Sequence, residues 1–245
     1  MLTFNWGNTF FGGRPVRDIV LERLPATFIL MGTALSFSCV VGTAIGVLGA
    51  VKRYSVFDYL ATTGAMIAMS FPTFWFGLMA IFVFAEKLRL LPAGGMETIG
   101  AESDVGDRLL HLVLPASVLG LVLVAEWSRY ARNSMLDVLH HDYVRTAHAK
   151  GLASIVVLWR HAFRNVLIPL VVLAGVQIPY VLSGALVAES IFSWPGMGRL
   201  FVDALTMRDY PVMMAVLMLT AFLVVMSNLL ADVVVAFVDP RVRFQ

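Results

Sequence analysis

Five long stretches of the chain contain no Asp, Glu, Lys or Arg. A helix crosses the roughly 30 Å hydrocarbon core of a bilayer with about 20 residues, so four of the stretches are long enough and the third is marginal. They show no alternation at period two and exceed the about 9 to 11 residues of a barrel strand, which favours α-helices. The sequence therefore predicts an all-α polytopic membrane protein. The five predicted spans are residues 24–51, 59–85, 109–125, 165–188 and 210–231.

The composition excludes several other classes of protein. Of the 245 residues, 59% are hydrophobic and only 14% are charged, more apolar surface than one soluble core can hide. The net charge of +2 speaks against disorder and against binding of nucleic acid. Cys39 is the sole cysteine, so it forms no internal disulfide and no cysteine-based metal site. Membrane lipid is therefore the expected surrounding for much of the chain.

The distribution of Lys and Arg predicts the orientation, because cytoplasmic loops carry an excess of both. The longest loop, residues 126–164, holds six of them, and placing it inside puts ten of the 18 on the cytoplasmic side. Residues 1–23 are then extracytoplasmic and residues 24–245 form one membrane domain. This orientation puts three arginines on the extracytoplasmic side, whereas a free N-terminal tail with such charges normally stays in the cytoplasm. They are Arg14, Arg17 and Arg23. We therefore expect that another span precedes residue 1 in the native gene product.

The usual signatures of a membrane enzyme are missing from the sequence. HExxH, GxSxG and a Walker A loop do not occur, so we predict no catalytic residues. Four histidines fall in the 126–164 loop, but their spacing is poor for a metal site. No ionisable residue lies in the middle of a predicted span, which argues against a secondary carrier or channel that works alone. A partner that contacts the cytoplasmic loop is the expected source of energy.

The 126–164 loop contains two helix-compatible stretches divided by Gly151. The upstream stretch runs through Leu136, Tyr143 and Lys150, and a glycine is suited to end it. The pattern alone fits a rigid helical knob and an amphipathic hairpin on lipid headgroups equally well.

The loop resembles the EAA loop of permease subunits of ATP-binding-cassette (ABC) importers, specifically the dipeptide, oligopeptide and nickel group. The resemblance rests on DYVRTAHAKG at 142–151 and RHAFRNVLIP at 160–169. SFPTFWFG at 70–77 and ESIFSWPGMGRL at 189–200 also match the family in order and spacing. His148 stands where the group more often has Arg. The family begins with an additional helix and an extracytoplasmic segment, which raises the alternative that this chain is a truncated, non-transporting remnant.

The resemblance implies the fold, the partners and the mechanism. The fold is the type I ABC importer transmembrane domain, in the cytoplasmic (inner) membrane of a bacterium or archaeon. The partners are a second homologous permease, two ABC ATPase subunits that bind ATP and Mg, and an extracytoplasmic solute-binding protein; this chain binds no cofactor. The EAA loop docks on an ATPase and couples its motion to the spans. The implied coupling residues are Asp142, Tyr143, Thr146, Ala147, Lys150 and Gly151, with His161, Arg164 and Asn165 as anchors.

Other features are weaker signals. Kinked spans that expose backbone carbonyls beside a polar side chain can line a transport pathway, although kinks are also common in helix packing. Gly42, Gly46 and Ala50 form a small-residue stripe that predicts close helix packing. Residues 193–198 are expected to cap the pore on the outside or to meet the binding protein. The cargo, peptide, nickel or another small solute, is left open. The pathway candidates are Pro72, Gln177, Pro179 and Ser183.

Overall fold

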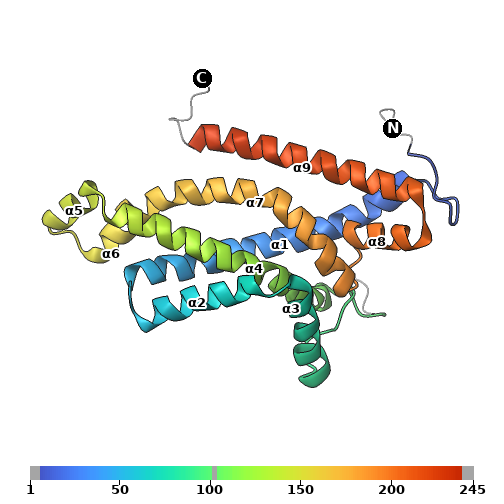
Figure 1. The fold of residues 1–245 in the computed structure, drawn as a ribbon, viewed down its shortest axis with the longest axis horizontal. Coiled ribbons are helices and arrows are strands. Elements are labelled where there is room, and N and C mark those ends of the chain that lie inside the picture. The colour runs from blue at the N-terminus through green and yellow to red at the C-terminus, as the bar shows by residue number, and fades with distance from the viewer. Residues whose placement is uncertain (1–5, 101–103, 239–245) are drawn as a thin grey trace. The chain divides into compact units, whose positions relative to one another are not determined.

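The computed structural model describes residues 6–100 and 104–238, and helices dominate it (Figure 1). Within these described residues, four helices are long and apolar enough to cross a membrane, and a fifth span results if one bent helix pair is counted as a span. The prediction of an all-α polytopic protein is confirmed. The elements are α1 (Val16–Val51), α2 (Val56–Ser70), α3 (Thr73–Ala80), the π-helical η1 (Ile81–Lys87), α4 (Val105–Leu139), α5 (Asp142–Ala149), α6 (Ser154–Val156), the π-helical η2 (Val157–Phe163), α7 (Arg164–Ile191), α8 (Met197–Met207) and α9 (Tyr210–Val238).

Helix α4 is longer than the sequence predicted. The marginal span 109–125 lies inside a single helix that continues to Leu139, so the predicted loop 126–164 begins as helix. The reason is a stripe of buried side chains that repeats every three or four residues beyond position 125. Trp127, Ala131 and Met135 are each fully buried. This buried apolar stripe stabilises the helix, although the charged residues of the segment had led to the prediction of a loop.

The predicted span at 59–85 is divided into separate helices in the structure. Helix α2 ends at Ser70, and α3 starts after Pro72, which has extended backbone angles (φ −62°, ψ 137°). Proline has no backbone N–H and disfavours helical angles in the residue before it, so the helix breaks here. Phe71 and Trp75 stack across the break, with ring centroids 4.7 Å apart. The segment is therefore a bent pair of helices rather than one continuous helix.

The chain divides into two compact units. The first unit comprises Met1–Ala34, Phe71–Gly120 and Pro179–Met226, and the second comprises Leu35–Ser70, Leu121–Ile178 and Ser227–Gln245. One core of the first unit joins the start of α1 to α8 and α9. This explains why α1 begins at Val16, ahead of the predicted start at residue 24. The buried residues of this core are Val16, Val20, Met197, Ala204, Val212, Ala215 and Val216.

Two glycines of α1 allow a close approach to α4 in the second unit. A Cβ atom on Gly46 would lie 2.4 Å from the carbonyl oxygen of Ser128, and one on Gly42 would lie 2.5 Å from Cβ of Trp127. Only hydrogen fits in these gaps, so α1 and α4 approach as closely as glycine permits. The predicted packing role of the small-residue stripe is confirmed, and Ala50 is also buried.

An ion pair joins α2 to α4 in the same unit. Arg132 donates from Nε and Nη2 to the two carboxylate oxygens of Asp58, over 2.6 and 2.8 Å. The backbone N–H of Tyr54 donates to the same carboxylate over 3.0 Å, and Asp58 itself donates its N–H to Oγ of Ser55. Ser55 thus caps the first turn of α2 through its hydroxyl, and the Asp58 carboxylate satisfies the N–H of the residue before that cap. The fork of two hydrogen bonds then fixes α2 against α4.

The glycine contact makes a prediction about stability. Gly46→Ala forces two helices apart, and overpacking of this kind costs about 1–3 kcal/mol. Gly64→Ala in α2 is the matched control, because its Cβ would meet no described atom within 4 Å. Alanine is favoured over glycine in a helix by about 1 kcal/mol, so the control should gain stability. Thermal unfolding of the purified protein in detergent should show the two variants shifting in opposite directions. A midpoint for Gly46→Ala at or above that of the parent protein contradicts the close contact.

Candidate functional site

The segment that resembles a coupling loop begins with an abrupt break after α4. Helix α4 ends at Leu139, and His141 has extended backbone angles (φ −71°, ψ 146°) before α5 starts at Asp142. The upstream stretch expected from Leu136 to Lys150 is therefore two helices, not one. The Asp142 side chain is 98% exposed in the first turn of α5, where a negative charge is favourable for the helix dipole.

Gly151 ends α5 by a Schellman motif. Its φ of +78° lies in the left-handed region, where a residue with a Cβ atom is strained. The N–H of Gly151 donates to the carbonyl of His148 over 2.9 Å, and the N–H of Leu152 donates to that of Ala147 over 3.4 Å. The expectation that this glycine stops the helix is confirmed. The chain can then reverse and enter α6.

The inner face of α5 is apolar and packs on η2. Val144 and Ala147 on α5 are 2% and 5% exposed, and Val157 and Ala162 on η2 are 1% and 0% exposed. Figure 1 shows α5 beside the start of the helix that continues as η2 and α7. Of the predicted coupling residues, Ala147 therefore packs within the chain and does not lie on its outer surface.

A side-chain bond ties α5 to the start of α7. Asn165 donates from Nδ2 to the hydroxyl of Tyr143 over 3.0 Å and to the carbonyl of His161 over 2.7 Å. The Tyr143 ring also stacks on His141, with centroids 5.6 Å apart. The structure thus brings together three residues that the sequence singled out, from both halves of the segment.

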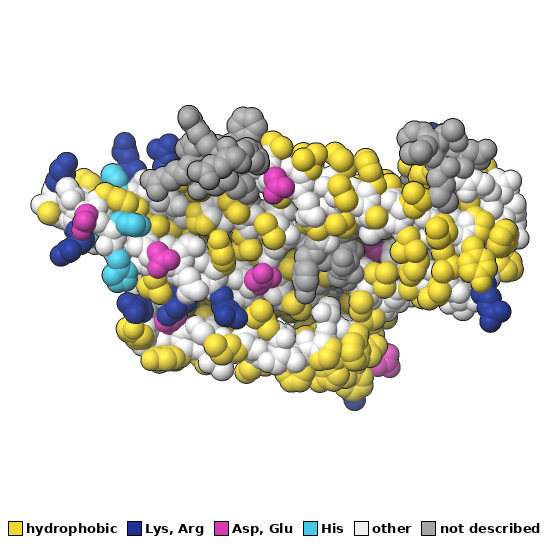
Figure 2. Space-filling view, turned by 45° about the horizontal axis from the view of Figure 1, so that its top comes forward, with side chains coloured by type: hydrophobic (Ala, Val, Ile, Leu, Met, Phe, Trp, Pro, Cys, Tyr) yellow, Lys and Arg dark blue, Asp and Glu magenta, His cyan; other side chains and the backbone are white. Residues whose placement is uncertain are grey.

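The outer face of α5 is polar. Thr146 is exposed and donates its hydroxyl to the carbonyl of Asp142 over 2.9 Å, while Lys150 and Arg164 are exposed as well. Arg164 makes no hydrogen bond or ion pair with the residues that the structure describes, so its guanidinium is available. Figure 2 shows Lys, Arg and His side chains gathered over the region of α5 and α6, next to hydrophobic surface. A rigid, charged knob of this kind suits contact with a soluble protein.

The pathway candidates lie in different surroundings. Gln177 is 3% exposed and accepts a hydrogen bond from the indole N–H of Trp127, and its Nε2 has no partner among the described atoms. Pro72 starts α3, and Pro179 lies within α7. The side chain of Ser183 lies outside the described residues.

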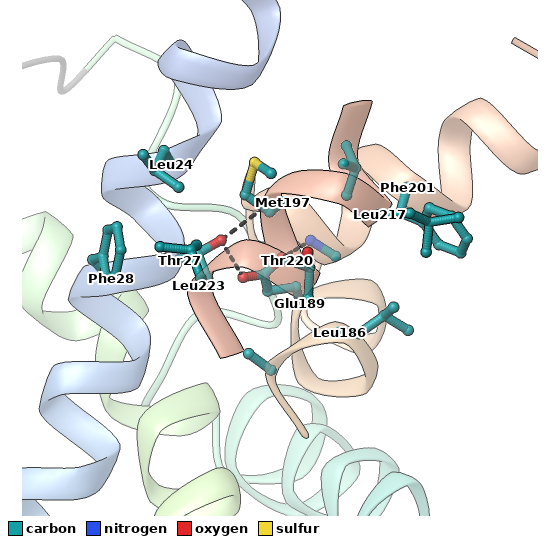
Figure 3. Close-up of a pocket in the computed structure, with 13 residues that line it drawn as sticks. Leu24, Thr27, Phe28, Leu186, Glu189, Met197, Phe201, Leu217, Thr220 and Leu223 are labelled. Atoms are coloured by element: carbon teal, nitrogen blue, oxygen red, sulfur yellow. Dashed lines mark hydrogen bonds between the residues drawn. The ribbon is translucent and has the colours of Figure 1, made fainter. Parts of the chain in front are cut away.

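Sequence reasoning missed a second polar cluster, in the first unit. Glu189 on α7 is fully buried, and Thr27 on α1 donates its hydroxyl to Glu189 Oε1 over 2.6 Å (Figure 3). Glu189 directly follows the charge-free stretch 165–188, so the sequence predicts that it is the first residue of a loop. Gly196 and Gly198, spaced seven and nine residues later, were the available signal of a close backbone approach.

The Tyr143–Asn165 bond generates a prediction about local stability. Tyr143→Phe keeps the ring and its stacking but removes the hydroxyl, and one such hydrogen bond contributes about 1 kcal/mol. Hydrogen exchange of the α5 amides should accelerate about fivefold, with the spans unaffected. Tyr59→Phe is the control, because that ring is 61% exposed and makes no hydrogen bond with the described residues. Unchanged exchange in α5 contradicts the anchoring role.

The fold is similar to that of solved transporter subunits. The chain matches the MetNI methionine ABC transporter in an inward-facing conformation with a TM-score of 0.72 at 16% identity, covering 92% of this chain and 99% of that one. It matches an amino acid ABC transporter crystallised with histidines with a TM-score of 0.61 at 10% identity, covering 90% and 94% of the two chains. These likenesses show a type I ABC importer transmembrane fold.

Sequence comparisons identify closer relatives. The chain is 44% identical over 232 residues to the oligopeptide transport system permease protein AppB of Bacillus subtilis, covering 95% of this chain and 73% of that protein. It is 39% identical over 250 residues to the dipeptide transport system permease protein DppB of Escherichia coli K12, covering 94% and 74%. A family model matches residues 42–244. The chain therefore belongs to the family of binding-protein-dependent transport system inner membrane components.

Proposed function

We propose that this chain is the transmembrane pore subunit of an ATP-driven importer of peptides. The family and the multi-pass helical fold support a permease. The peptide cargo is supported by relatives at 39% to 44% identity, which are named for oligopeptide and dipeptide transport. In this reading the permease is not itself an enzyme. Two ABC ATPase subunits supply the energy, and an extracytoplasmic binding protein delivers the cargo.

The observation that carries the proposal is the construction of α5. The helix is stopped by Gly151, packed on η2 through Val144, and tied to Asn165 by Tyr143. These three restraints make it a rigid element continuous with α7, a helix long enough to be part of a span. A push on α5 from an ATPase would therefore reach α7 without first deforming the loop.

The same geometry separates the coupling candidates into two groups. Tyr143, Ala147, His161 and Asn165 fix α5 in place. Asp142, Thr146, Lys150 and Arg164 are exposed and are the residues we assign to contact with the ATPase. Gly151 sets the length of the helix. A second, related permease is expected to supply the other half of the pore.

A secondary carrier is the rival function. It requires an ion-coupling site built from charged groups in the membrane. Asp58, Glu189 and Asp209 are the buried carboxylates of the described residues, and each accepts hydrogen bonds from neighbouring groups of the protein. Their use as internal braces favours a subunit that is driven from outside.

Transport by the assembled complex tests the proposal. The permease, its partner permease and the two ATPases are reconstituted in liposomes with the binding protein, and uptake of labelled peptides of two to five residues is measured. We expect uptake that requires both ATP and the binding protein. Uptake without ATP identifies a carrier, and ATP-driven uptake of a non-peptide solute alone overturns the cargo assignment.

The coupling role makes a sharper prediction. Gly151→Val places a β-branched side chain at φ +78°, so the end of α5 must change although space around the residue is open. Peptide uptake per ATP hydrolysed should fall at least about tenfold, because a misplaced docking element costs of that order. The complex should still assemble in the membrane.

Gly100→Val is the matched control for this variant. Gly100 has φ +91° and equally open surroundings, but it lies in the loop that we place on the extracytoplasmic side. The control variant should transport normally. If Gly151→Val keeps the parent ratio of uptake to hydrolysis, α5 is not the coupling element.

A further inference from the structure

The start of helix α8 is buried and lacks a cap of its own. Its N-cap residue is Gly196, which has no side chain, and the first N–H groups of a helix have no partner within the helix. Buried donors of this kind must be satisfied from elsewhere. Trp194 and Met197, on either side of Gly196, are 1% and 5% exposed, so water does not reach this turn freely.

Two residues of other helices accept hydrogen bonds from these N–H groups. The N–H of Met197 donates to Oγ1 of Thr27 over 2.8 Å. The N–H groups of Gly198 and Arg199 donate to Oε2 of Glu189 over 2.6 and 3.2 Å. Thr27 belongs to α1 and Glu189 to α7, so residues of two other helices cap α8. Figure 3 shows Thr27 and Glu189 pointing toward each other and toward the start of α8.

The close approach explains both glycines of the GMG sequence. A Cβ atom on Gly196 would lie 2.2 Å from Oε1 of Glu189, and one on Gly198 would lie 2.4 Å from Cα of Leu186. Any side chain at either position would push the carboxylate or α7 away from α8. A further bond from the indole N–H of Trp194 to the carbonyl of Ala26, over 2.8 Å, fixes the preceding turn.

The buried carboxyl group of Glu189 depends on α8 for two of its hydrogen-bond partners. Glu189 is 0% exposed, and no Lys, Arg or His of the described residues lies within 4.0 Å of its carboxylate. Arg199 instead directs its guanidinium to the carbonyl of Ser193 and to Asp203. The N–H groups at the positive end of the α8 dipole are therefore two of the main partners of this buried carboxyl group. Moving α8 away would leave a buried polar group without these partners, which is unfavourable.

A cavity lies against the same cluster. Its volume is about 220 Å³, and α1, α7, α8 and α9 all contribute to its walls. Thr27, Glu189 and Gly198 line it together with Phe201, Leu217 and Thr220. Helix α8 thus forms one wall of the cavity, and side chains of α1 and α7 bond to its first turn.

We propose that Glu189, with Thr27, is a positioning residue for transport, a latch that holds α8 closed on the extracytoplasmic side of the permease. The proposal rests on the proposed function for its role in the transport cycle. Opening the latch breaks three hydrogen bonds to the α8 start together. The closed position should therefore be strongly favoured until the binding protein or the ATPases supply energy.

Cysteine accessibility tests the latch without relying on transport. In a Cys39→Ser background, Met197→Cys is labelled from outside with a membrane-impermeant maleimide on the reconstituted complex. Glu189→Ala and Thr27→Val should each speed labelling about tenfold or more, because each removes hydrogen bonds of the buried cluster that holds the start of α8. Thr27→Ser keeps the hydroxyl and should restore the slow rate. Glu86→Ala, an exposed residue of η1, is the control and should label like the parent.

ATP hydrolysis provides the second readout. Without binding protein, the hydrolysis rate per complex should rise severalfold in the Thr27→Val variant and return to the parent value in Thr27→Ser. A purely structural role would lower the yield of folded complex but leave this rate unchanged. Equal labelling of the Val and Ser variants overturns the latch, even if Glu189→Ala does not fold. If Thr27→Val is labelled fast but the parent complex imports no peptide, the latch is supported and the proposed function is rejected.

Discussion

The ends of buried helices impose the strongest constraint on this protein. Each helix leaves several N–H and C=O groups unpaired, and lipid offers no water to satisfy them. Three helix ends, among them the exposed end of α5, are closed by different means. Ser55 and Asp58 cap the start of α2, and Gly151 closes the end of α5 with a Schellman motif. At α8 the cap comes from Thr27, 170 residues earlier in the sequence, and from Glu189 near the end of α7.

Glycine makes the other close contacts possible, and it does so for two physical reasons. Gly46 and Gly198 have no room for a Cβ atom, so glycine is required by sterics. Gly151 has open space around it, and there glycine is required by a positive φ. The distinction matters for function, because the first kind fixes how helices pack and the second kind fixes where a helix ends.

Only 14% of the residues are charged, and the exposed and the buried charged residues have different roles. Exposed charges on and directly after α5, such as Asp142 and Lys150, are free for contact with a soluble partner. Buried charges serve the interior: Asp58 with Arg132 braces α2 against α4, and Glu189 holds α8. This division agrees with a permease that receives its energy through an external docking element and needs no ion-coupling site of its own.

The sequence determined the helical class, the five apolar stretches, the glycine stop at residue 151 and, through its motifs, the family. These features are local: runs of apolar residues, a residue type that tolerates positive φ, and an ordered set of short patterns. The extent of α4 was missed because a buried stripe at Trp127, Ala131 and Met135 is visible only when the partner surface is known. The sequence indicates a kinked span at Pro72, but only the structure shows that α2 and α3 are separate helices there.

Only the tertiary structure decided the role of Glu189. In the sequence it is one acidic residue after an apolar run, and its meaning depends on three segments that meet from positions 27, 189 and 197–199. The same holds for the bond between Tyr143 and Asn165. Local propensity and hydropathy follow from neighbours along the chain. Hydrogen bonds between remote helices depend on how the chain folds back on itself, and no spacing rule in the sequence encodes them.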